Sequence, residues 1–234
     1  NNNNNNNTEI SACNEPALKR IKLNKDNNSD NDNIESTRSP SLNLDNKCGK
    51  IIHGNKDYAF HYLYNNKEDS NLITLTDLKQ IFASCLPRMG KKYVMRHVFD
   101  YNHRLLACKL KNNNNITNNN DMDGEVIGGM CIRPFFNVNF AEVVFLAVKS
   151  EYQRKSIGRL LMRVFKQFLV GNGINKLYTY ADNQAIDFFT KMGFKTVHVT
   201  KNTYKEAFYP YIKHYTGSEL MECKLYNNVN YINF

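Results

Sequence analysis

The clearest pattern in the chain is an amphipathic stretch in its second half. Apolar residues recur over Ile157–Leu169 at spacings of three and four, which is the period of an α-helix. Gly171 and Gly173 follow at once and predict the end of this helix. The run before it, Asn139–Val148, is apolar on both faces, as expected of a central buried strand. Together they predict a strand that leads through a short loop into a long helix.

Weaker patterns predict further elements on both sides of this pair. Three helices are expected: one from an N-cap at Thr76 to Pro87, with an apolar face of Leu75, Leu78, Ile81, Phe82 and Leu86, one over Lys91–Phe99, and one over Asn183–Met192. Asp182 or Asn183 caps the last of these helices, and Gly193 ends it. The expected strands are Arg104–Leu110, Glu125–Arg133, Lys176–Tyr180, Phe194–Val199 and Leu220–Leu225. Antiparallel strands followed by a β-α-β-α-β order predict an α/β fold with a mixed sheet and helices on both faces.

Asparagine-rich tracts divide the chain into three parts. Residues 1–47 are rich in Asn, Ser and Asp and poor in aromatic residues, so we expect a disordered tail. Residues 48–226 form the predicted folded domain, with an Asn-rich loop insertion at 111–124 between two strands, and 227–234 form a C-terminal tail. The basic cluster at 18–25 in the first tail is compatible with a nuclear-import signal.

Composition and charge narrow the class of protein. Apolar residues make up 41% of the chain, but no apolar run approaches the roughly 18–20 residues of a membrane-spanning helix, so we expect no membrane partner. The six cysteines form no CxxC pair, which argues against a structural zinc site and favours reduced thiols. The net charge is +9, and the part after residue 47 carries +10, which favours anionic ligands such as nucleotide phosphates or nucleic acid.

Glu142 is the first candidate for chemistry. It lies in the middle of the predicted buried strand, between Ala141 and Val143, where an ionised carboxylate is costly without a partner or water. Burial raises the pKa of a carboxyl group toward the range that a general base needs. A structural ion pair with a Lys or Arg would also explain this residue, and the sequence leaves both interpretations open.

The loop between this strand and the long helix is the second candidate. It reads Gln153-Arg154-Lys155-Ser156-Ile157-Gly158-Arg159. A loop that opens a helix directs free backbone N–H groups and the positive end of the helix dipole at one point, which suits a phosphate group. Basic residues ahead of a helix are more often simply solvated. The interpretation of this loop as a phosphate site is strengthened only by its position, directly after the strand that carries Glu142.

Five segments in a fixed order then identify a resemblance over residues 72–225. They are LTDLKQIFASCLPRMGKKYVMRHVFD (75–100), VIGGMCIRPF (126–135), FAEVVFLAV (140–148), TYADNQAIDFFTKMGF (179–194) and YIKHYTGSELMEC (211–223). With the Q-x-x-x-x-G loop, this order resembles the acetyl-CoA-binding core of the GNAT superfamily of N-acetyltransferases. It is most similar to the nuclear histone acetyltransferases that are catalytic subunits of SAGA-type coactivator complexes. The resemblance implies the GNAT fold, with a mixed, mostly antiparallel sheet, helices on both faces and splayed central strands.

The resemblance also implies a function and a set of site residues. The activity would be histone lysine N-acetylation, with direct transfer from acetyl-CoA to the lysine side-chain amine of a histone tail, histone three being the expected one, and without a metal. The implied roles are a general base (Glu142), backbone groups that pair with the pantetheine arm (Leu146, Ala147, Val148), a pyrophosphate loop (Gln153, Arg154, Lys155, Ser156, Ile157, Gly158, Arg159) and two residues that line the cofactor channel (Ala185, Phe189). Implied partners are the histone tail, subunits of a coactivator complex and nucleosomal DNA, and the implied location is the nucleus, in chromatin and transcription regulation.

Three positions bear on this expectation. Ser156 replaces a glycine of the family's loop, so we expect weakened but not lost cofactor binding, with the serine hydroxyl available as an N-cap or phosphate donor. His214 replaces an Asp, and Pro210 a Gly, in the part that shapes the peptide groove. Phe189 stands where many small-molecule acetyltransferases carry a Tyr acid, and the histone branch also has Phe there.

Two other functions remain open from the sequence. One is a GNAT acetyltransferase for a small amine or a non-histone protein, against which stand the segments 75–100 and 211–223. The other is a non-catalytic adaptor with the same fold. The acid inside the buried strand argues against it, because nothing structural requires Glu142 there.

Overall fold

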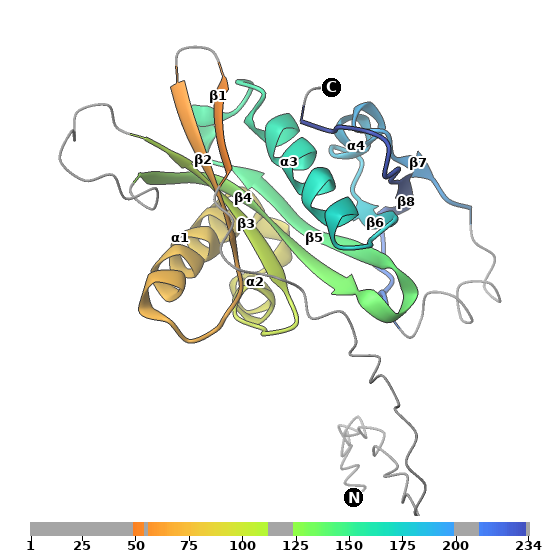
Figure 1. Cartoon of the computed structure of the whole chain (residues 1–234). Coiled ribbons are helices and arrows are strands. Elements are labelled where there is room, and N and C mark those ends of the chain that lie inside the picture. Colours follow the sequence, from red (N-terminus) through yellow and green to blue (C-terminus); the bar gives the residue numbers. More distant parts are fainter. Residues whose placement is uncertain (1–48, 54–55, 112–123, 199–210, 233–234) are drawn as a thin grey trace, which may run out of the picture. The chain divides into compact units, whose positions relative to one another are not determined.

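The computed structural model describes residues 49–53, 56–111, 124–198 and 211–232 (Figure 1). The predictions for the tail 1–47, for nearly all of the loop insertion and for Val199 and Pro210 lie outside these residues.

A single mixed sheet organises the described residues. Its strands lie in the order β1-β2-β3-β4-β5-β6-β8-β7. Every neighbouring pair is antiparallel except β5 and β6, which are parallel. The mostly antiparallel sheet predicted from the sequence is therefore confirmed. The strands are β1 (Gly49–His53), β2 (Lys56–Leu63), β3 (Arg104–Leu110), β4 (Glu125–Phe135), β5 (Phe140–Val148), β6 (Lys176–Ala181), β7 (Lys195–Thr196) and β8 (Glu219–Lys224).

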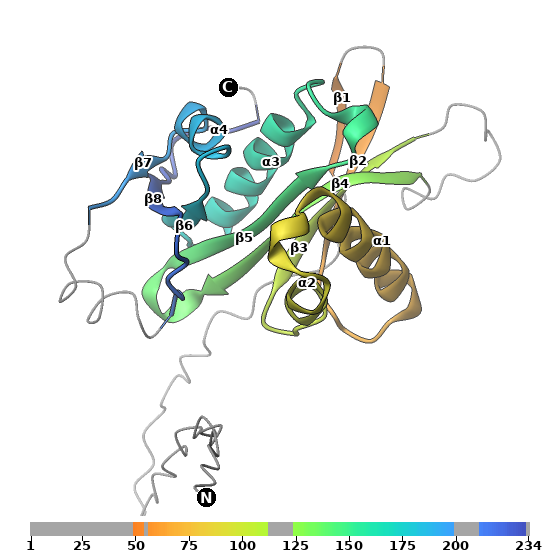
Figure 2. The same cartoon turned by 180° about the vertical axis from the view of Figure 1, so that it is seen from behind.

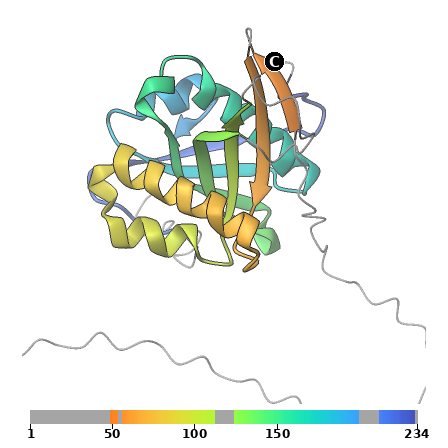
Figure 3. The same ribbon diagram turned by 90° about the vertical axis from the view of Figure 1, so that its left-hand side faces the viewer.

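Helices cover both faces of the sheet (Figures 2 and 3). The helices are α1 (Asp69–Cys85), α2 (Lys91–Val98), α3 (Ile157–Gly171) and α4 (Ile186–Lys191), with short 3₁₀ turns η1 (Pro87–Met89), η2 (Phe136–Val138) and η3 (Ser150–Tyr152). On β3, Leu105 and Ala107 pack with α1 and α2, whereas Leu106 packs with α3. This alternation follows from the two-residue period of a strand and creates one apolar core on each face.

Helix α3 follows its sequence pattern closely. Its apolar stripe is buried against the sheet, and it ends at Gly171, with Gly173 at a φ of 76°. Lys166 lies on the same helix but is also buried, and its Nζ donates a hydrogen bond of 2.5 Å to the carbonyl of Met192. This bond fastens the end of α4 to α3.

Several predicted boundaries are wrong. Thr76 is not an N-cap, because α1 begins at Asp69 and the Thr76 hydroxyl donates to the carbonyl of Leu72 within the helix. Helix α4 begins only at Ile186, since Asp182 accepts backbone N–H bonds from Gln184 and Ala185 and forms a separate turn. Strands β1 and β2 had no prediction.

The predicted C-terminal tail is packed as far as it is described. Residues 227–232 form no helix or strand. The Tyr231 backbone N–H donates to Oε1 of Gln167 on α3, and the Tyr231 ring lies 5.7 Å from Nζ of Lys166. These contacts join the segment to the α3 face.

His61 on β2 is a polar residue inside the apolar core. Its side chain is 1% exposed, and neither ring nitrogen has a hydrogen-bond partner among the described residues. Burial lowers the pKa of His61, and the nearby charge of Lys109 lowers it further. The folded protein therefore holds this imidazole neutral.

We predict that His61→Leu stabilises the fold. An unsatisfied buried polar group costs about 1–3 kcal/mol, and leucine removes that cost. This gain in the free energy of unfolding should grow below pH 6.5. There His61 binds a proton in the unfolded wild-type chain but not in the folded protein, where its pKa is lowered. Urea denaturation of both proteins at pH 7.5 and 5.5 measures it, with exposed His198 (His198→Leu) as a control expected to show no gain. Equal loss of stability on acidification in wild type and His61→Leu would contradict this account.

Candidate active site

The site begins where β5 and β6 separate. Their parallel pairing covers only Phe140–Glu142 against Lys176–Tyr178. One step further, the Thr179 hydroxyl donates a 3.0 Å hydrogen bond to the carbonyl of Val143. Beyond that bond, β5 continues to Val148 without a strand partner on this side among the described residues. An edge of free backbone groups therefore lies inside the protein.

A β-bulge accompanies this separation. The register of β4 against β5 shifts between Cys131 and Ile132, so that Val144 has no Cα partner on β4. A bulge bends its strand and increases the local twist, which helps to turn β5 away from β6.

The open edge presents the backbone groups of alternate residues. The Lys149 N–H donates 2.8 Å to Ile127 on β4, so by alternation Ala147 also faces β4, whereas Leu146 and Val148 face the opening. The Val148 carbonyl already accepts Nε2 of Gln153 at 2.9 Å. Of the three predicted backbone positions, the Leu146 groups and the Val148 N–H are thus the ones directed to the opening.

A cavity of about 420 Å³, here named the loop cavity, lies between this edge and the start of α3. It brings together most of the residues predicted from the loop, namely Gln153, Arg154, Ser156, Ile157, Gly158 and Arg159, with Leu146, Ala147 and Val148 from β5. Lys155 does not line it, because its Nζ donates to the carbonyl of Glu151 and lies 5.3 Å from the Tyr152 ring.

The N-terminus of α3 forms one end of the loop cavity. Ser156 adopts the left-handed conformation with a φ of 62°, and its carbonyl accepts the Leu160 N–H. Its hydroxyl makes no capping hydrogen bond, so the expected side-chain cap is absent. No acidic side chain lies in the first turn either. The first N–H groups of α3 and its positive dipole end are therefore free to bind an anion.

Gly158 leaves space in this turn. A Cβ at this position would lie 3.5 Å from the Phe188 ring and 3.7 Å from Leu146, which are ordinary contacts. The protein's own packing does not require a glycine here, so the missing side chain leaves room for a ligand near the helix N-terminus.

Glu142 lies in a second cavity of about 410 Å³, here named the base cavity. The two cavities share Leu86, Leu146 and Phe188 as lining residues. Ala185 and Phe189 line the base cavity rather than the loop cavity. The sequence-predicted residues thus divide between two adjoining spaces, one at the helix N-terminus and one at the carboxyl group.

The Glu142 carboxyl group is buried and is unpaired within the described part of the chain. The residue is 7% exposed, and no ion pair or hydrogen bond reaches its side chain from the described part of the chain. Burial raises its pKa to about 7, against the opposing charge of Arg133 on β4. Of the two interpretations left open by the sequence, the structure favours a carboxylate poised to exchange a proton over a structural ion pair.

Two tyrosines that the sequence analysis did not single out face each other across the base cavity. Tyr93 comes from α2 and Tyr215 from the segment before β8, and their hydroxyls are hydrogen-bonded. They are 122 residues apart in the chain, so no local pattern pairs them. His214 is exposed, and its ring lies 5.5 Å from that of Tyr180.

The described residues give two further observations. They contain no group of three or more His, Cys, Asp or Glu side chains placed to hold a metal ion. Among them, every helix is too short or too polar to cross a membrane.

Comparisons with known proteins agree with this geometry. Residues 75–194 match the acetyltransferase (GNAT) family. Curated relatives named histone acetyltransferase GCN5 are 34% identical in Oryza sativa, over 86% of this chain, and 35% identical in Debaryomyces hansenii, over 80% of it. The chain spans 36% of the length of each of these two proteins.

Two solved structures extend the comparison. Tetrahymena GCN5 is 38% identical with a TM-score of 0.61, over 73% of this chain and 98% of that one. Its catalytic domain in complex with coenzyme A gives a TM-score of 0.56 at the same identity, over 74% and 96%. This chain therefore belongs to the GNAT family of acetyltransferases and contains a GCN5-like catalytic domain.

Proposed function

We propose that this protein is a histone lysine N-acetyltransferase that uses acetyl-CoA. The observation that carries the proposal is a buried carboxyl group with a pKa near 7, at a cavity adjoining an open strand edge and a helix N-terminus. The relatives are named histone acetyltransferase GCN5, which supports histones as the substrate. We propose the tail of histone three as the site of transfer.

The loop cavity has the features that acetyl-CoA requires. The α3 N-terminus, Arg154 and Arg159 suit the pyrophosphate group, and the Leu146 and Val148 N–H groups suit an extended pantetheine arm. When bound, acetyl-CoA supplies an acetyl thioester that a neutral amine can attack. The Leu146 amide is in addition a candidate to polarise the thioester oxygen.

Glu142 is proposed as the general base. The substrate lysine arrives as an ammonium group, which has no lone pair for attack. Glu142 accepts one of its protons, directly or through water, and a pKa near 7 suits this transfer at neutral pH. The amine nitrogen then forms its bond to the acetyl carbon while the carbon–sulfur bond breaks, and the coenzyme leaves as a thiolate, which takes up the second proton that the nitrogen loses as the amide forms. No residue of the chain becomes covalently attached to the acetyl group.

A basic histone tail is compatible with the basic domain. Charge is screened over about 8 Å at physiological salt, so groups near the groove outweigh the net charge. The base cavity is lined by Glu142 and Asp182 against Arg88. We propose that the positive charge elsewhere serves nucleosomal DNA, that subunits of a coactivator complex are partners, and that the protein acts in the nucleus.

Two experiments test the function against its rivals. Mass spectrometry of core histones incubated with the protein and acetyl-CoA identifies acetylated lysines, and a parallel assay with spermidine tests a small-amine enzyme. Calorimetry with acetyl-CoA tests the adaptor. Transfer to spermidine alone, or no detectable binding of acetyl-CoA, would overturn the proposal.

We predict that Glu142→Gln lowers kcat at pH 7 by roughly 10²–10⁴-fold, because the amide cannot take up the proton. The affinity for acetyl-CoA should stay nearly unchanged, since Glu142 lies outside the loop cavity. Activity should partly return at high pH, where more of the lysine is already neutral. A radiolabelled acetyl-transfer assay and calorimetry measure these effects.

The matched control is Glu68→Gln, a change of the same kind at an exposed residue before α1. It should leave both measurements unchanged. A Glu142→Gln protein as active as wild type at pH 7 would refute the assignment of the base.

We predict that Ser156→Gly stabilises the protein by about 1 kcal/mol, because glycine adopts the left-handed conformation of this residue without cost. It should also tighten acetyl-CoA binding, since the backbone can then approach the phosphates more closely. Thermal unfolding and calorimetry measure the two effects.

Gly158→Ala provides the opposite change in the same turn. Its Cβ fits the protein but occupies space in the loop cavity, so stability should be retained while acetyl-CoA binding weakens. If Ser156→Gly binds acetyl-CoA no more tightly than wild type, the serine does not weaken cofactor binding and the prediction is wrong.

A further inference from the structure

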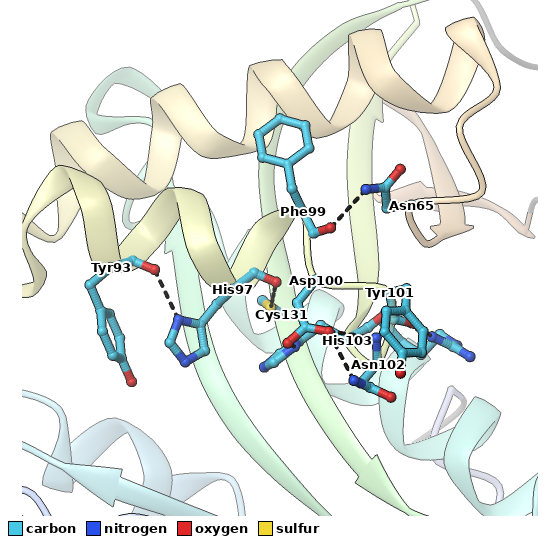
Figure 4. Close-up of polar contacts among 10 residues, drawn as sticks. Asn65, Tyr93, His97, Phe99, Asp100, Tyr101, Asn102, His103 and Cys131 are labelled. Carbon is cyan, nitrogen blue, oxygen red and sulfur yellow. Dashed lines mark hydrogen bonds and ion pairs between the residues drawn. The ribbon is translucent and has the colours of Figure 1, made fainter. Parts of the chain in front are cut away.

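A polar cluster lies beside the end of α2 (Figure 4). Glu142 belongs to the same face of the sheet, because its neighbours Ala141 and Val143 pack on the α3 side. Asp100 follows α2, and its Oδ1 accepts hydrogen bonds from the backbone and side-chain amides of Asn102 at 2.8 and 3.1 Å. Its Oδ2 lies 3.5 Å from Nδ1 of His103. His97 is held by its Nδ1 contact with the Tyr93 carbonyl at 2.9 Å. The cluster is therefore fixed in place by local bonds.

The histidines of this cluster are neutral at pH 7. Burial is the main cause that lowers the pKa of His103, to about 4, and that of His97. The charge of Arg133 lowers both further, whereas Asp100 raises them. With both imidazoles neutral, Arg133 is the charged group that acts on Glu142, and it acts on Asp100 as well.

The strand register places Arg133 near both carboxyl groups, because Arg104, which follows His103, pairs with Ile132 on β4. Arg133 is the direct cross-strand partner of Glu142 in the β4–β5 register, and its positive charge acts on both Glu142 and Asp100. Its guanidinium stands over the Phe135 ring, 5.2 Å from the centroid. No carboxylate of the described residues lies within ion-pair distance of Arg133. The charge of Arg133 thus acts on both Glu142 and Asp100, but Arg133 forms a close ion pair with neither.

Resting on the proposed function, we propose that Arg133 and Asp100 are positioning residues for Glu142. Asp100 competes with Glu142 for the Arg133 guanidinium and so prevents a tight ion pair with the base. Phe135 supports the guanidinium in this shared position. Glu142 then keeps the proton affinity that lysine deprotonation requires, while Arg133 keeps enough of the carboxylate ionised to accept a proton.

Further titratable or charged groups surround Glu142. The elements packed against Glu142 contribute Cys131 and Arg133 from β4, Tyr93 and His97 from α2, Asp100 and His103 from the segment before β3, and Tyr178 and Tyr180 from β6. The wall of the base cavity adds Arg88, Asp182 and Tyr215. Burial raises the pKa values of Cys131, Tyr178 and Tyr215, so these remain neutral near pH 7.

The test measures the pKa of Glu142 directly, by carbon-13 NMR of labelled glutamate carboxyl groups in the full chain, with Glu142→Gln to assign the signal. Arg133→Met should raise this pKa by roughly one unit, because an attractive charge is lost. Asp100→Asn should lower it by roughly one unit, because Arg133 then turns to Glu142. The acid limb of the pH profile of kcat/KM should move in the same directions.

A double variant decides how Asp100 acts. If Asp100 acts through Arg133, Asp100→Asn added to Arg133→Met causes no further shift. A further downward shift of the Glu142 pKa in the double variant would mean that Asp100 repels Glu142 directly. If the Glu142 pKa is unchanged in both single variants, the proposal is overturned altogether. Arg133→Lys keeps the charge and should stay near wild type, and Arg96→Met, an exposed arginine on α2, is the matched control with no shift.

The outcomes separate this inference from the proposed function. If Glu142→Gln remains active, the proposed base is wrong whatever the titration shows. If Glu142→Gln is inactive but the Glu142 pKa does not respond to Arg133→Met, the function stands and the positioning role fails.

Discussion

The short parallel pairing between β5 and β6 is the constraint on which the rest of the site depends. Because it ends at Glu142, the following residues of β5 have, on one side, backbone groups that no strand among the described residues satisfies. Unpaired backbone groups inside a protein are costly unless water or a ligand binds them. The Thr179 and Gln153 side chains satisfy two carbonyls at the ends of the gap, and the groups between them remain for an extended ligand.

The same separation fixes the chemistry of Glu142. It is the last β5 residue paired with β6, so it is buried by the sheet yet opens onto a cavity. Burial without a tight ion pair costs stability, and the fold tolerates the cost because the carboxyl group can be protonated near neutral pH. The left-handed Ser156 represents a similar cost at the other end of the site, where a sharp turn directs the start of α3 at the ligand space.

The two cavities also explain why the catalytic and the binding groups come from separate segments. Most of the loop cavity is built from one continuous piece, the end of β5 to the start of α3, while Cys85, Leu86 and residues from Phe188 to Met192 complete its lining. The base cavity instead needs η1 and α2 on one wall and residues 215–218 on the other. The groups that suit an anion thus come mainly from one local unit, whereas the space beside Glu142 is formed only by segments far apart in the chain.

The sequence by itself determined the helix α3, the buried strand β5, the unusual position of Glu142 and the loop before α3. Each of these is indicated by local hydrophobic periodicity or by a charged residue type within an apolar or helix-opening segment. The sequence missed β1 and β2, placed the starts of α1 and α4 wrongly, and paired neither Tyr93 with Tyr215 nor Arg133 with Glu142 and Asp100. These features depend on register, on a bulge and on contacts between distant segments. Local periodicity carries no information about which edge of a strand stays unpaired, so only the tertiary structure decided where the sheet opens and how the acid inside it is surrounded.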